Sequence, residues 1–253
     1  MKVFFSDIDN TLIYSYRHDI GQQKQCVEIY QGREISFMTN KSYQALHKIC
    51  ESYTFVPTTT RTIEQYKRID FGIEVPEYAL VCNGGILLKH GISDRAWYEE
   101  SLKQIEGAED SLDKAAYHLE RDEHISFEIR NIHNLFLFTK SDDVNATVTT
   151  LMSELDTEQV DILSNGSKVY VVPKELNKGN ALLRLKKKLG AKISIAAGDS
   201  EFDVPMLAAA DMAMAPDGLR DKIRQAHNVT FVPEHMLFSE EVLNNLEKLA
   251  ENS

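Results

Sequence analysis

The sequence predicts an α/β protein, in which an open parallel sheet is built from both ends of the chain and an α+β segment is inserted between them. Two observations predict this fold. Short apolar runs alternate with amphipathic helical patterns in the N-terminal third, and the same alternation returns after Pro173. Between about Gly85 and Val172 the pattern changes to several strands with two helices. We therefore expect a core domain formed by residues 1–84 and 173–253, with an inserted domain at 85–172.

Each element of the core follows from a local pattern. Val3–Phe5 is an apolar run that ends in acids, which indicates a buried strand, and Ala45, Leu46 and Ile49 share one helical face. Gln31-Gly32-Arg33 separates two strand-like runs and predicts a hairpin. We expect core strands at Val3–Phe5, Cys26–Tyr30, Glu34–Phe37, Thr54–Thr58, Tyr78–Cys82, Ile193–Ala197, Met212–Ala215 and Val229–Val232. We expect core helices at Ser42–Cys50, Ile63–Ile69, 181–189, 204–209 and Glu240–Glu251.

The inserted segment combines helices with strands that tight turns connect. The Ser101–Leu119 pattern predicts one acidic helix, and the spacing of apolar residues over 144–155 predicts a second. We expect strands at Ile86–Leu88, Ser126–Arg130, Leu135–Thr139, Val160–Leu163 and Lys168–Val172.

The composition excludes several classes of protein. The 253 residues are 43% hydrophobic and 26% charged, a globular balance that argues against a disordered or fibrous chain. The net charge of −11 disfavours binding to nucleic acid or to an anionic membrane. No apolar run approaches the ~18 residues of a membrane helix, and the N-terminus lacks the apolar stretch of a signal peptide. We expect a cytoplasmic protein, whose Cys26, Cys50 and Cys82 are small buried hydrophobes in a reducing compartment.

An acidic pair follows the first predicted strand. Asp7 and Asp9 are two residues apart, so their carboxylates project to one side at the carboxyl end of that strand, where open parallel sheets bind ligands. A hard cation would relieve their repulsion. One carboxylate could then attack while its neighbour moves protons. The alternative is an acidic turn that caps the next segment.

A second acidic cluster follows the Ile193–Ala197 strand. Gly198 allows a sharp turn, and Asp199 and Asp203 follow it. Two acidic clusters at strand ends of one sheet are the natural halves of a magnesium site. The alternative is N-capping of the 204–209 helix, which explains Asp203 but not Asp199.

Two further elements favour an anionic ligand. The segment Thr58-Thr59-Thr60-Arg61 lies between a strand and a helix, where hydroxyls and backbone N–H groups can form an anion site. The alternative is plain helix capping, which needs only one of these hydroxyls. Lys178 begins a helix, where its positive charge is unfavourable beside the positive end of the helix dipole. An anionic partner, such as a carboxylate or a phosphate, would offset this cost. A solvated surface lysine is the alternative.

In this order and spacing, the four elements resemble the motifs of the haloacid dehalogenase (HAD) superfamily, and most closely those of its Cof-type or IIB phosphatases. The resemblance covers nearly the whole chain. The four motifs are matched by Asp7-Ile8-Asp9-Asn10-Thr11-Leu12, Thr59, Lys178 and Gly198-Asp199-Ser200-Glu201-Phe202-Asp203. Val81-Cys82-Asn83-Gly84-Gly85 resembles the run that leads into the cap domain. The resemblance implies a Rossmann-like core with an inserted α/β cap that selects the substrate.

The resemblance also implies catalytic roles. Asp7 would be the nucleophile that forms an aspartyl-phosphate, and Asp9 would protonate the leaving oxygen and then activate water. Lys178 would offset the charge of Asp7. The phosphoryl oxygens would be held by Thr59, Thr60, Asn83 and Lys178.

The same resemblance implies that Mg²⁺ is the cofactor. Asp7, the backbone carbonyl of Asp9 and Asp199 would bind the ion, and Asp203 would support the site. Phosphoryl transfer is mostly positioning and charge neutralisation, which Mg²⁺ and a lysine supply.

The sequence departs from the family pattern in three places. Thr60 replaces a frequent glycine, and Phe202 replaces a frequent asparagine. Thr39 is an alternative second-motif threonine, but Thr59 is better spaced from the strand that follows it. The 14–34 segment is longer than the connection that usually follows the first motif in this family, and its hairpin could cover the pocket.

Substrate contacts are expected in two places. In the 14–34 segment, the candidates are Arg17 and His18. In the inserted domain, the candidates are Arg130, Asn131, His133 and Asn134, although ordinary turn residues explain them as well.

The sequence therefore predicts a Mg²⁺-dependent phosphoric monoester hydrolase that acts on a small phosphorylated metabolite such as a sugar phosphate. The alternatives are a phosphomutase with the same aspartyl chemistry, a phospho-accepting receiver switch and a silent binding module. A receiver lacks the second acid two residues after the acceptor, which argues against it here. We expect no nucleic-acid or membrane partner, and a monomer or a weak homodimer.

Overall fold

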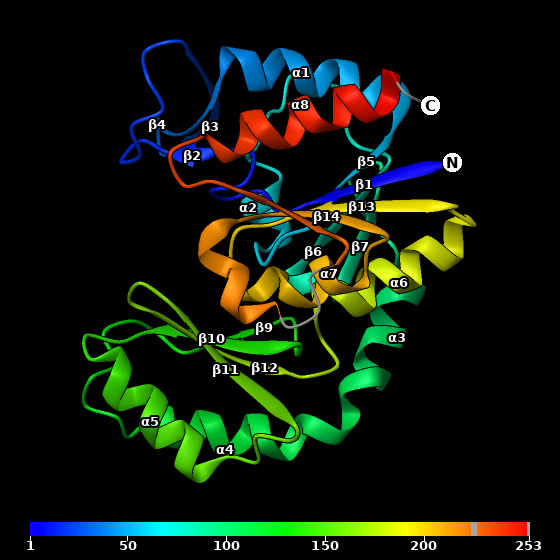
Figure 1. Cartoon of the computed structure of the whole chain (residues 1–253). Coiled ribbons are helices and arrows are strands. Elements are labelled where there is room, and N and C mark those ends of the chain that lie inside the picture. Colours follow the sequence, from blue (N-terminus) through cyan, green and yellow to red (C-terminus); the bar gives the residue numbers. More distant parts are fainter. Residues whose placement is uncertain (224–226, 252–253) are drawn as a thin grey trace. The chain divides into compact units, whose positions relative to one another are not determined.

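The computed structural model describes residues 1–223 and 227–251, and the chain divides into two compact units (Figure 1). The first unit consists of Met1–Asp94 and Lys178–Ser253, and the second of Arg95–Asn177. The predicted domain boundaries differ slightly from these, for a physical reason. The strands β6 (Tyr78–Val81), β7 (Ile86–Lys89) and β8 (Ile92–Ser93) form one antiparallel sheet, so residues 85–94 remain with the first unit.

A five-stranded parallel sheet lies at the centre of the first unit. Its strand order is β15-β14-β13-β1-β5. The strands are β15 (Val229–Val232), β14 (Met212–Pro216), β13 (Ile193–Ala197), β1 (Lys2–Ser6) and β5 (Thr54–Pro57). The sheet combines strands from both ends of the chain, as the sequence predicted. Val3, Phe4 and Phe5 of β1 are completely buried, which explains why this strand is apolar throughout.

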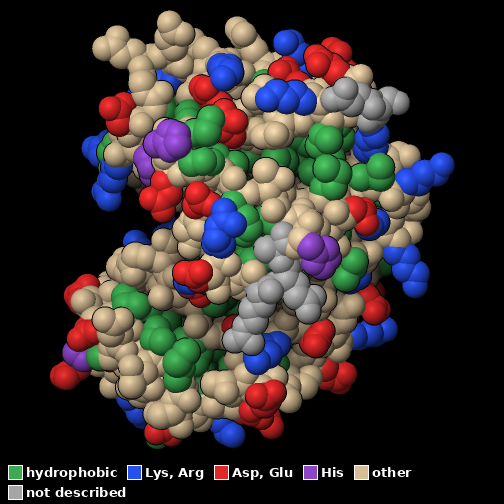
Figure 2. Space-filling view, viewed as in Figure 1, with side chains coloured by type: hydrophobic (Ala, Val, Ile, Leu, Met, Phe, Trp, Pro, Cys, Tyr) green, Lys and Arg blue, Asp and Glu red, His purple; other side chains and the backbone are tan. Residues whose placement is uncertain are grey.

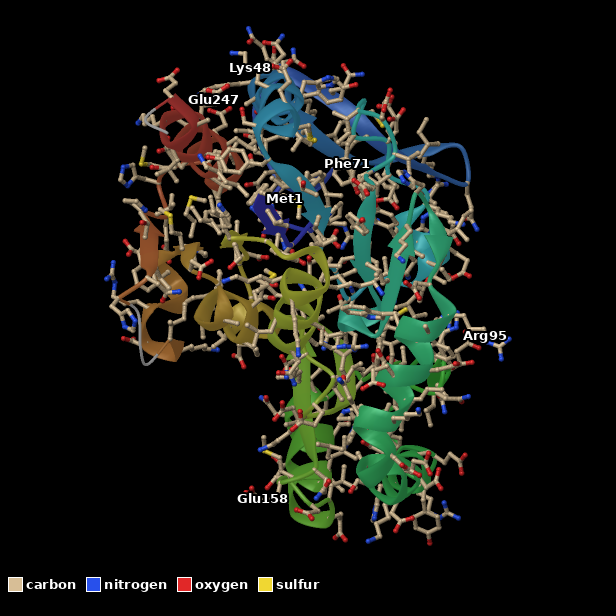
Figure 3. All side chains as sticks on the ribbon, turned by 90° about the vertical axis from the view of Figure 1, so that its right-hand side faces the viewer. Met1, Lys48, Phe71, Arg95, Glu158 and Glu247 are labelled. Carbon is tan, nitrogen blue, oxygen red and sulfur yellow. The ribbon has the colours of Figure 1, made fainter. Side chains whose placement is uncertain are left out.

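Helices cover both faces of this sheet. Figure 1 shows α1 (Asn40–Ser52) and α8 (Phe238–Glu251) on one face, and α6 (Lys178–Leu189) and α7 (Val204–Ala209) on the other. Lys48 of α1 pairs with Glu247 of α8 at 3.5 Å, and both are labelled in Figure 3. The short helix α2 (Ile63–Tyr66) ends before the predicted Ile69. The described part of this unit also contains the 3₁₀ turns η1 (Cys82–Gly84), η3 (Glu201–Asp203) and η4 (Asp217–Lys222).

A small antiparallel sheet follows the first acidic pair. It contains β2 (Tyr14–Ser15), β3 (Lys24–Tyr30) and β4 (Arg33–Thr39) in the order β2-β4-β3. Gln31 and Gly32 both have positive φ (51° and 73°), as a two-residue hairpin turn requires. Thr39 ends β4 and accepts a hydrogen bond from the Ser42 N–H, so it caps α1. Thr39 therefore follows a strand outside the parallel sheet, which removes it as the alternative second-motif threonine.

The second unit has an α+β fold of its own. Its four-stranded antiparallel sheet has the order β11-β12-β10-β9. The strands are β11 (Val160–Asn165), β12 (Lys168–Pro173), β10 (Phe136–Lys140) and β9 (Arg130–Ile132). Three helices belong to this unit, α3 (Arg95–Ile105), α4 (Glu109–Leu119) and α5 (Val144–Glu154). Its core is built from apolar residues that include Ala115, Leu151 and Val171.

Two predictions in this unit were wrong. The predicted helix Ser101–Leu119 is two helices, because a 3₁₀ turn, η2 (Glu106–Ala108), interrupts the chain at Gly107. The predicted strand Ser126–Arg130 is not a strand before Arg130, so the turn that follows is shifted: Arg130 and Asn131 belong to β9, while His133 and Asn134 form the turn with positive φ.

The cysteines only partly match their prediction. Cys82 is buried, whereas Cys26 and Cys50 are half-buried, and all three are free thiols. Among the described residues, no helix combines the length and the apolar character needed to cross a bilayer. Acidic and basic side chains are interspersed on the face shown in Figure 2.

Candidate active site

The predicted site residues follow the carboxyl ends of adjacent parallel strands. In the register of the sheet, Ser6 at the end of β1 lies opposite both Pro57 of β5 and Ala197 of β13. The chain beyond these positions stays aligned, because the Asp7 N–H donates to the Ala197 carbonyl at 2.8 Å and the Thr58 N–H donates to the Ser6 carbonyl at 2.7 Å. The sheet therefore presents the first, second and fourth motifs at one edge.

Lys178 joins two of the predicted aspartates. Its Nζ lies 2.5 Å from Asp7 Oδ1 and 2.6 Å from Asp203 Oδ1. All three residues are buried, with 6% of Asp7, 1% of Lys178 and none of Asp203 exposed. A buried lysine needs such anionic partners, because its charge would otherwise lose hydration without compensation. The alternative of a solvated surface lysine is therefore wrong.

Asp203 organises the turn after β13. Its Oδ2 accepts hydrogen bonds from the Asp199 N–H (3.1 Å), the Ser200 N–H (3.0 Å) and the Ser200 hydroxyl (2.8 Å). Asp203 stands at the N-cap position of α7, as the capping alternative expected, but its carboxylate makes no hydrogen bond to this helix. The turn also requires Gly198, because a Cβ there would lie 2.3 Å from the Asp203 Cβ.

A cluster of three carboxylates could hold a metal ion. Asp7, Asp199 and Asp203 each offer an oxygen, and these oxygens lie within 4.8 Å of one another. Thr11, in the loop after β1, donates its hydroxyl to Asp199 Oδ1 at 3.2 Å. Carboxylate oxygens at this spacing fit a hard divalent cation.

The electrostatics of the cluster also fit a cation. Burial, together with the charges of Asp203 and Asp199, raises the pKa of Asp7 well above its usual value, although Lys178 opposes this rise. Burial and the neighbouring Asp203 raise the pKa of Asp199 to about 7. Burial alone would lower the pKa of Lys178, but Asp203 and Asp7 raise it, so this lysine stays charged. One lysine thus faces an excess of negative charge, which a divalent cation would balance.

The Asp9 carboxylate has a separate partner. Arg61 Nε donates to Asp9 Oδ2 at 2.8 Å, and Arg61 Nη2 donates to Asp9 Oδ1 at 2.7 Å. This two-point contact fixes the plane of the carboxylate, since the guanidinium fork matches carboxylate geometry. The sequence-based prediction assigned Arg61 no role of its own. The only feature of the sequence that pointed to Arg61 was its place two residues after Thr59, the second-motif threonine.

Comparisons with known proteins bear on this geometry. The family profile of the haloacid dehalogenase-like hydrolases matches residues 92–232, more than half of the chain. The chain belongs to this family. The matched range includes Lys178, Asp199 and Asp203, and the ion pair of Lys178 connects Asp7 to them. No curated protein matches the sequence significantly.

Solved structures share the fold of this HAD-like hydrolase at low sequence identity. A sucrose-phosphatase from Synechocystis sp., solved with sucrose and phosphate, is 15% identical over 97% of this chain and 96% of its own, with a TM-score of 0.65. A HAD-superfamily phosphatase from Bacteroides thetaiotaomicron is 16% identical over 98% and 95%, with a TM-score of 0.58. The C-terminal domain of a trehalose-6-phosphate phosphatase from C. albicans is 15% identical over 99% and 92%, also at 0.58. The predicted fold, a Rossmann-like core with an inserted α+β unit, is confirmed, and the family supports a phosphatase enzyme.

The second-motif loop of the hydrolase is held by a turn of unusual backbone conformation. Cys82, Asn83 and Gly84 all have positive φ. This turn lets the Cys82 N–H donate to the Arg61 carbonyl at 2.8 Å and the Asn83 N–H donate to the Thr59 carbonyl at 2.9 Å. Asn83 thus reaches the predicted phosphate site through its backbone, and its side chain is buried.

The two predicted threonines differ in their surroundings. Thr59 is buried, and its hydroxyl accepts a hydrogen bond from the Arg61 N–H at 3.1 Å. Thr60 is half-buried. The phosphate-binding roles of Thr59, Thr60 and Asn83 remain predictions.

A cavity of about 650 Å³ borders the acidic cluster. Its lining includes Asn10, Asp199, Tyr14, His18 and His235. Of the two candidates in the 14–34 segment, His18 therefore lines a cavity next to the cluster. Arg17 instead donates its Nε to the Tyr16 hydroxyl at 3.1 Å in an exposed position. Phe202, at the place of the family's frequent asparagine, is buried.

The candidates of the inserted unit stay predictions. The Arg130 guanidinium lies 4.7 Å from the Phe127 ring and also pairs with Glu128. The His133 carbonyl accepts a hydrogen bond from the Tyr98 hydroxyl at 2.9 Å.

Proposed function

We propose that this HAD-like hydrolase is a Mg²⁺-dependent phosphatase that hydrolyses a small phosphorylated metabolite, with a sugar phosphate as the leading substrate class. The buried ion pair of Asp7 with Lys178, beside Asp199 and Asp203 at the strand ends, supports this function most directly. The sugar-phosphate class is supported by the sucrose-phosphatase and trehalose-6-phosphate phosphatase that share the fold.

Asp7 is the nucleophile in this proposal. Its carboxylate attacks the phosphorus, the bond to the leaving oxygen breaks, and an aspartyl-phosphate forms. The attack requires an ionised carboxylate, but burial raises the pKa of Asp7. The contact of Lys178 Nζ with Asp7 Oδ1 favours the ionised form and holds one oxygen in place.

Asp9 is the general acid and base in this proposal. Its side chain is 48% exposed, so it can contact a bound substrate while it remains paired with Arg61. Asp9 acts as the acid in its protonated form: it gives this proton to the leaving oxygen, and the resulting carboxylate then takes a proton from the water that hydrolyses the aspartyl-phosphate, which restores the starting form.

Mg²⁺ would be held by Asp7, Asp199 and the backbone carbonyl of Asp9, and when bound it would neutralise charge on the phosphoryl oxygens. Asp203 would support the ion by fixing the backbone of Asp199 and Ser200. The backbone and hydroxyl of Thr59 would bind a phosphoryl oxygen.

The test is turnover of p-nitrophenyl phosphate by the purified protein. We expect hydrolysis with Mg²⁺, and at least a ~10³-fold loss with EDTA or in Asp7→Asn, because nucleophile and charge neutralisation are both essential. Activity that survives Asp7→Asn would exclude Asp7 as nucleophile. Transfer to a sugar hydroxyl in place of water would identify a phosphomutase, and a long-lived phosphoryl-aspartate would identify a receiver switch.

The substrate, the oligomeric state and the cellular location are the remaining expectations. A screen of phosphorylated metabolites would identify the substrate, and light scattering would distinguish the expected monomer from a weak homodimer. A cytoplasmic location suits a substrate of this class.

A further inference from the structure

A buried glutamate of the β3–β4 hairpin lies behind the Arg61–Asp9 pair. The Glu28 side chain is completely buried, and Arg61 Nη2 donates to its Oε2 at 3.0 Å. The Ser36 hydroxyl donates to the same oxygen at 2.7 Å, and Arg68 Nε donates to Oε1 at 3.0 Å. Arg61 therefore joins two carboxylates, one half-exposed on Asp9 and one fully buried on Glu28.

The strand is irregular at this residue. Regular alternation would bury every second side chain of β3, but Val27 and Glu28 are both buried. The pairing with β4 shifts register on both sides of Glu28, which is a β-bulge. Bulges re-aim side chains and are frequent beside active sites.

The hairpin is also fixed to the segment that follows the second motif. Glu28 forms an antiparallel bridge with Ile69, and the Asp70 N–H donates to the Val27 carbonyl at 2.8 Å. The backbone at Glu28 is thus paired on both sides, with β4 and with Ile69, so its carboxylate provides a fixed support for Arg61.

We infer that Glu28 is a positioning residue of the proposed reaction: through Arg61, it holds the Asp9 carboxyl group in the orientation from which its protonated form gives a proton to the leaving oxygen. This inference rests on the proposed function. Arg61 alone has a long side chain with several rotamers, and Asp9 is on a half-exposed loop. The bond to buried Glu28 removes this freedom before the substrate arrives, which is what a positioned acid requires.

A purely structural role is the competing explanation, because Glu28 also neutralises Arg68 and closes the hairpin. The two explanations differ in one measurable property. Loss of a positioned general acid slows the departure of a basic leaving group more than that of a stable one. Loss of structure lowers the fraction of active enzyme, and so reduces the rates with all substrates equally.

The experiment compares phenyl phosphate with p-nitrophenyl phosphate, which differ little in shape but strongly in the basicity of the leaving oxygen. In Glu28→Gln we expect kcat/KM for phenyl phosphate to fall about 10–100-fold and that for p-nitrophenyl phosphate to fall about threefold or less, within the range of general acid catalysis. Asp9→Asn should show the same preference more strongly. An unchanged ratio in Glu28→Gln would overturn the inference.

A second variant guards against misfolding. Glu28→Asp keeps the charge beside Arg61 and Arg68 but withdraws the carboxylate by one methylene, and should shift the ratio in the same direction. Glu34→Gln, on an exposed position of the same hairpin, is the matched control and should leave the ratio unchanged. A change in Glu34→Gln equal to that in Glu28→Gln would contradict a specific role.

A double-mutant cycle shows whether the effect passes through Arg61. Adding Glu28→Gln to Arg61→Met should change the substrate ratio no further, because the connection is already lost. Failure of the proposed function is visible separately, since the unmodified protein would then be inactive or Asp7→Asn would be active. An active protein that depends on Asp7 but has additive Glu28 and Arg61 effects would refute this inference alone.

Discussion

Lys178 is the buried cation that neutralises two carboxylates of the site. Its ammonium is buried between Asp7 and Asp203, so replacing it with an apolar side chain leaves two buried carboxylates without their cation. We expect Lys178→Met to lose about 3–5 kcal/mol of unfolding free energy near pH 8, the usual cost of breaking a buried ion pair from one side. Hydrolysis of p-nitrophenyl phosphate should be abolished.

The loss of stability should be smaller near pH 5. With Lys178 absent, burial favours the protonated form of Asp7, so acid relieves the penalty. Urea unfolding at both pH values measures this difference. Lys186→Met is the control, because Lys186 pairs with a half-exposed Asp211 at the surface and should cost about 1 kcal/mol or less. Equal losses in the two variants would contradict the role of Lys178.

Site residues could be identified from the sequence where they directly follow a predicted strand, because the end of the strand determines their position. Asp7 and Asp199 follow apolar strands, so their meeting at one edge could be predicted from pattern alone. The contacts of Asp203 could not, because helix capping and support of a turn both suit an aspartate before a helix. The Glu28–Arg61–Asp9 connection was missed for another reason: it depends on a bulge, and one acid between Val27 and Ile29 has no periodic signature.

At the scale of elements, the turn from β13 into η3 is the most constrained connection. A side chain at Gly198 would collide with Asp203, which cannot move without losing its bonds to Lys178 and Ser200. We expect Gly198→Ala to cost about 1–3 kcal/mol of unfolding free energy, as overpacking does, and to lower kcat with it. Denaturant unfolding and steady-state kinetics measure the two effects.

The matched control for Gly198→Ala is Gly107→Ala. A Cβ at Gly107 would lie 3.6 Å from its nearest neighbour, an ordinary contact with the Gln159 side chain. This variant should be active and nearly as stable as the unmodified protein. If Gly198→Ala were equally harmless, the turn could relax without the rigid support that we attribute to Asp203.

Elements could be predicted where burial sets the pattern of apolar residues, either along a whole strand or along one face of a helix. The parallel strands and α1 follow their apolar patterns closely. The break between α3 and α4 was missed because the apolar period continues across it, and only Gly107 marks the interruption. The short α2 was overestimated, since helix ends depend on caps and backbone bonds more than on propensity.

At the scale of the whole molecule, the acidic cluster joins distant parts of the chain at a cost in charge repulsion. Burial and Asp203 raise the pKa of Asp199 to about 7 in the folded protein, whereas an unfolded chain has an ordinary aspartate. The folded state therefore binds an extra proton between about pH 4 and 7, and without metal its stability should fall as pH rises through this window.

A divalent cation should replace the proton in this balance. At pH 8, above the pKa of Asp199, saturating Mg²⁺ at about 100 times its Kd should stabilise the folded state by about 2.7 kcal/mol, or raise Tm by about 5–10 °C. At pH 5 a protonated Asp199 binds the ion more weakly, so the shift in Tm should be much smaller. Scanning calorimetry with Mg²⁺ or EDTA at both pH values measures this, and Asp199→Asn should lose most of the shift at pH 8. Equal shifts at the two pH values would mean that the ion binds elsewhere, because only a site made of these buried carboxylates connects metal binding to their protonation.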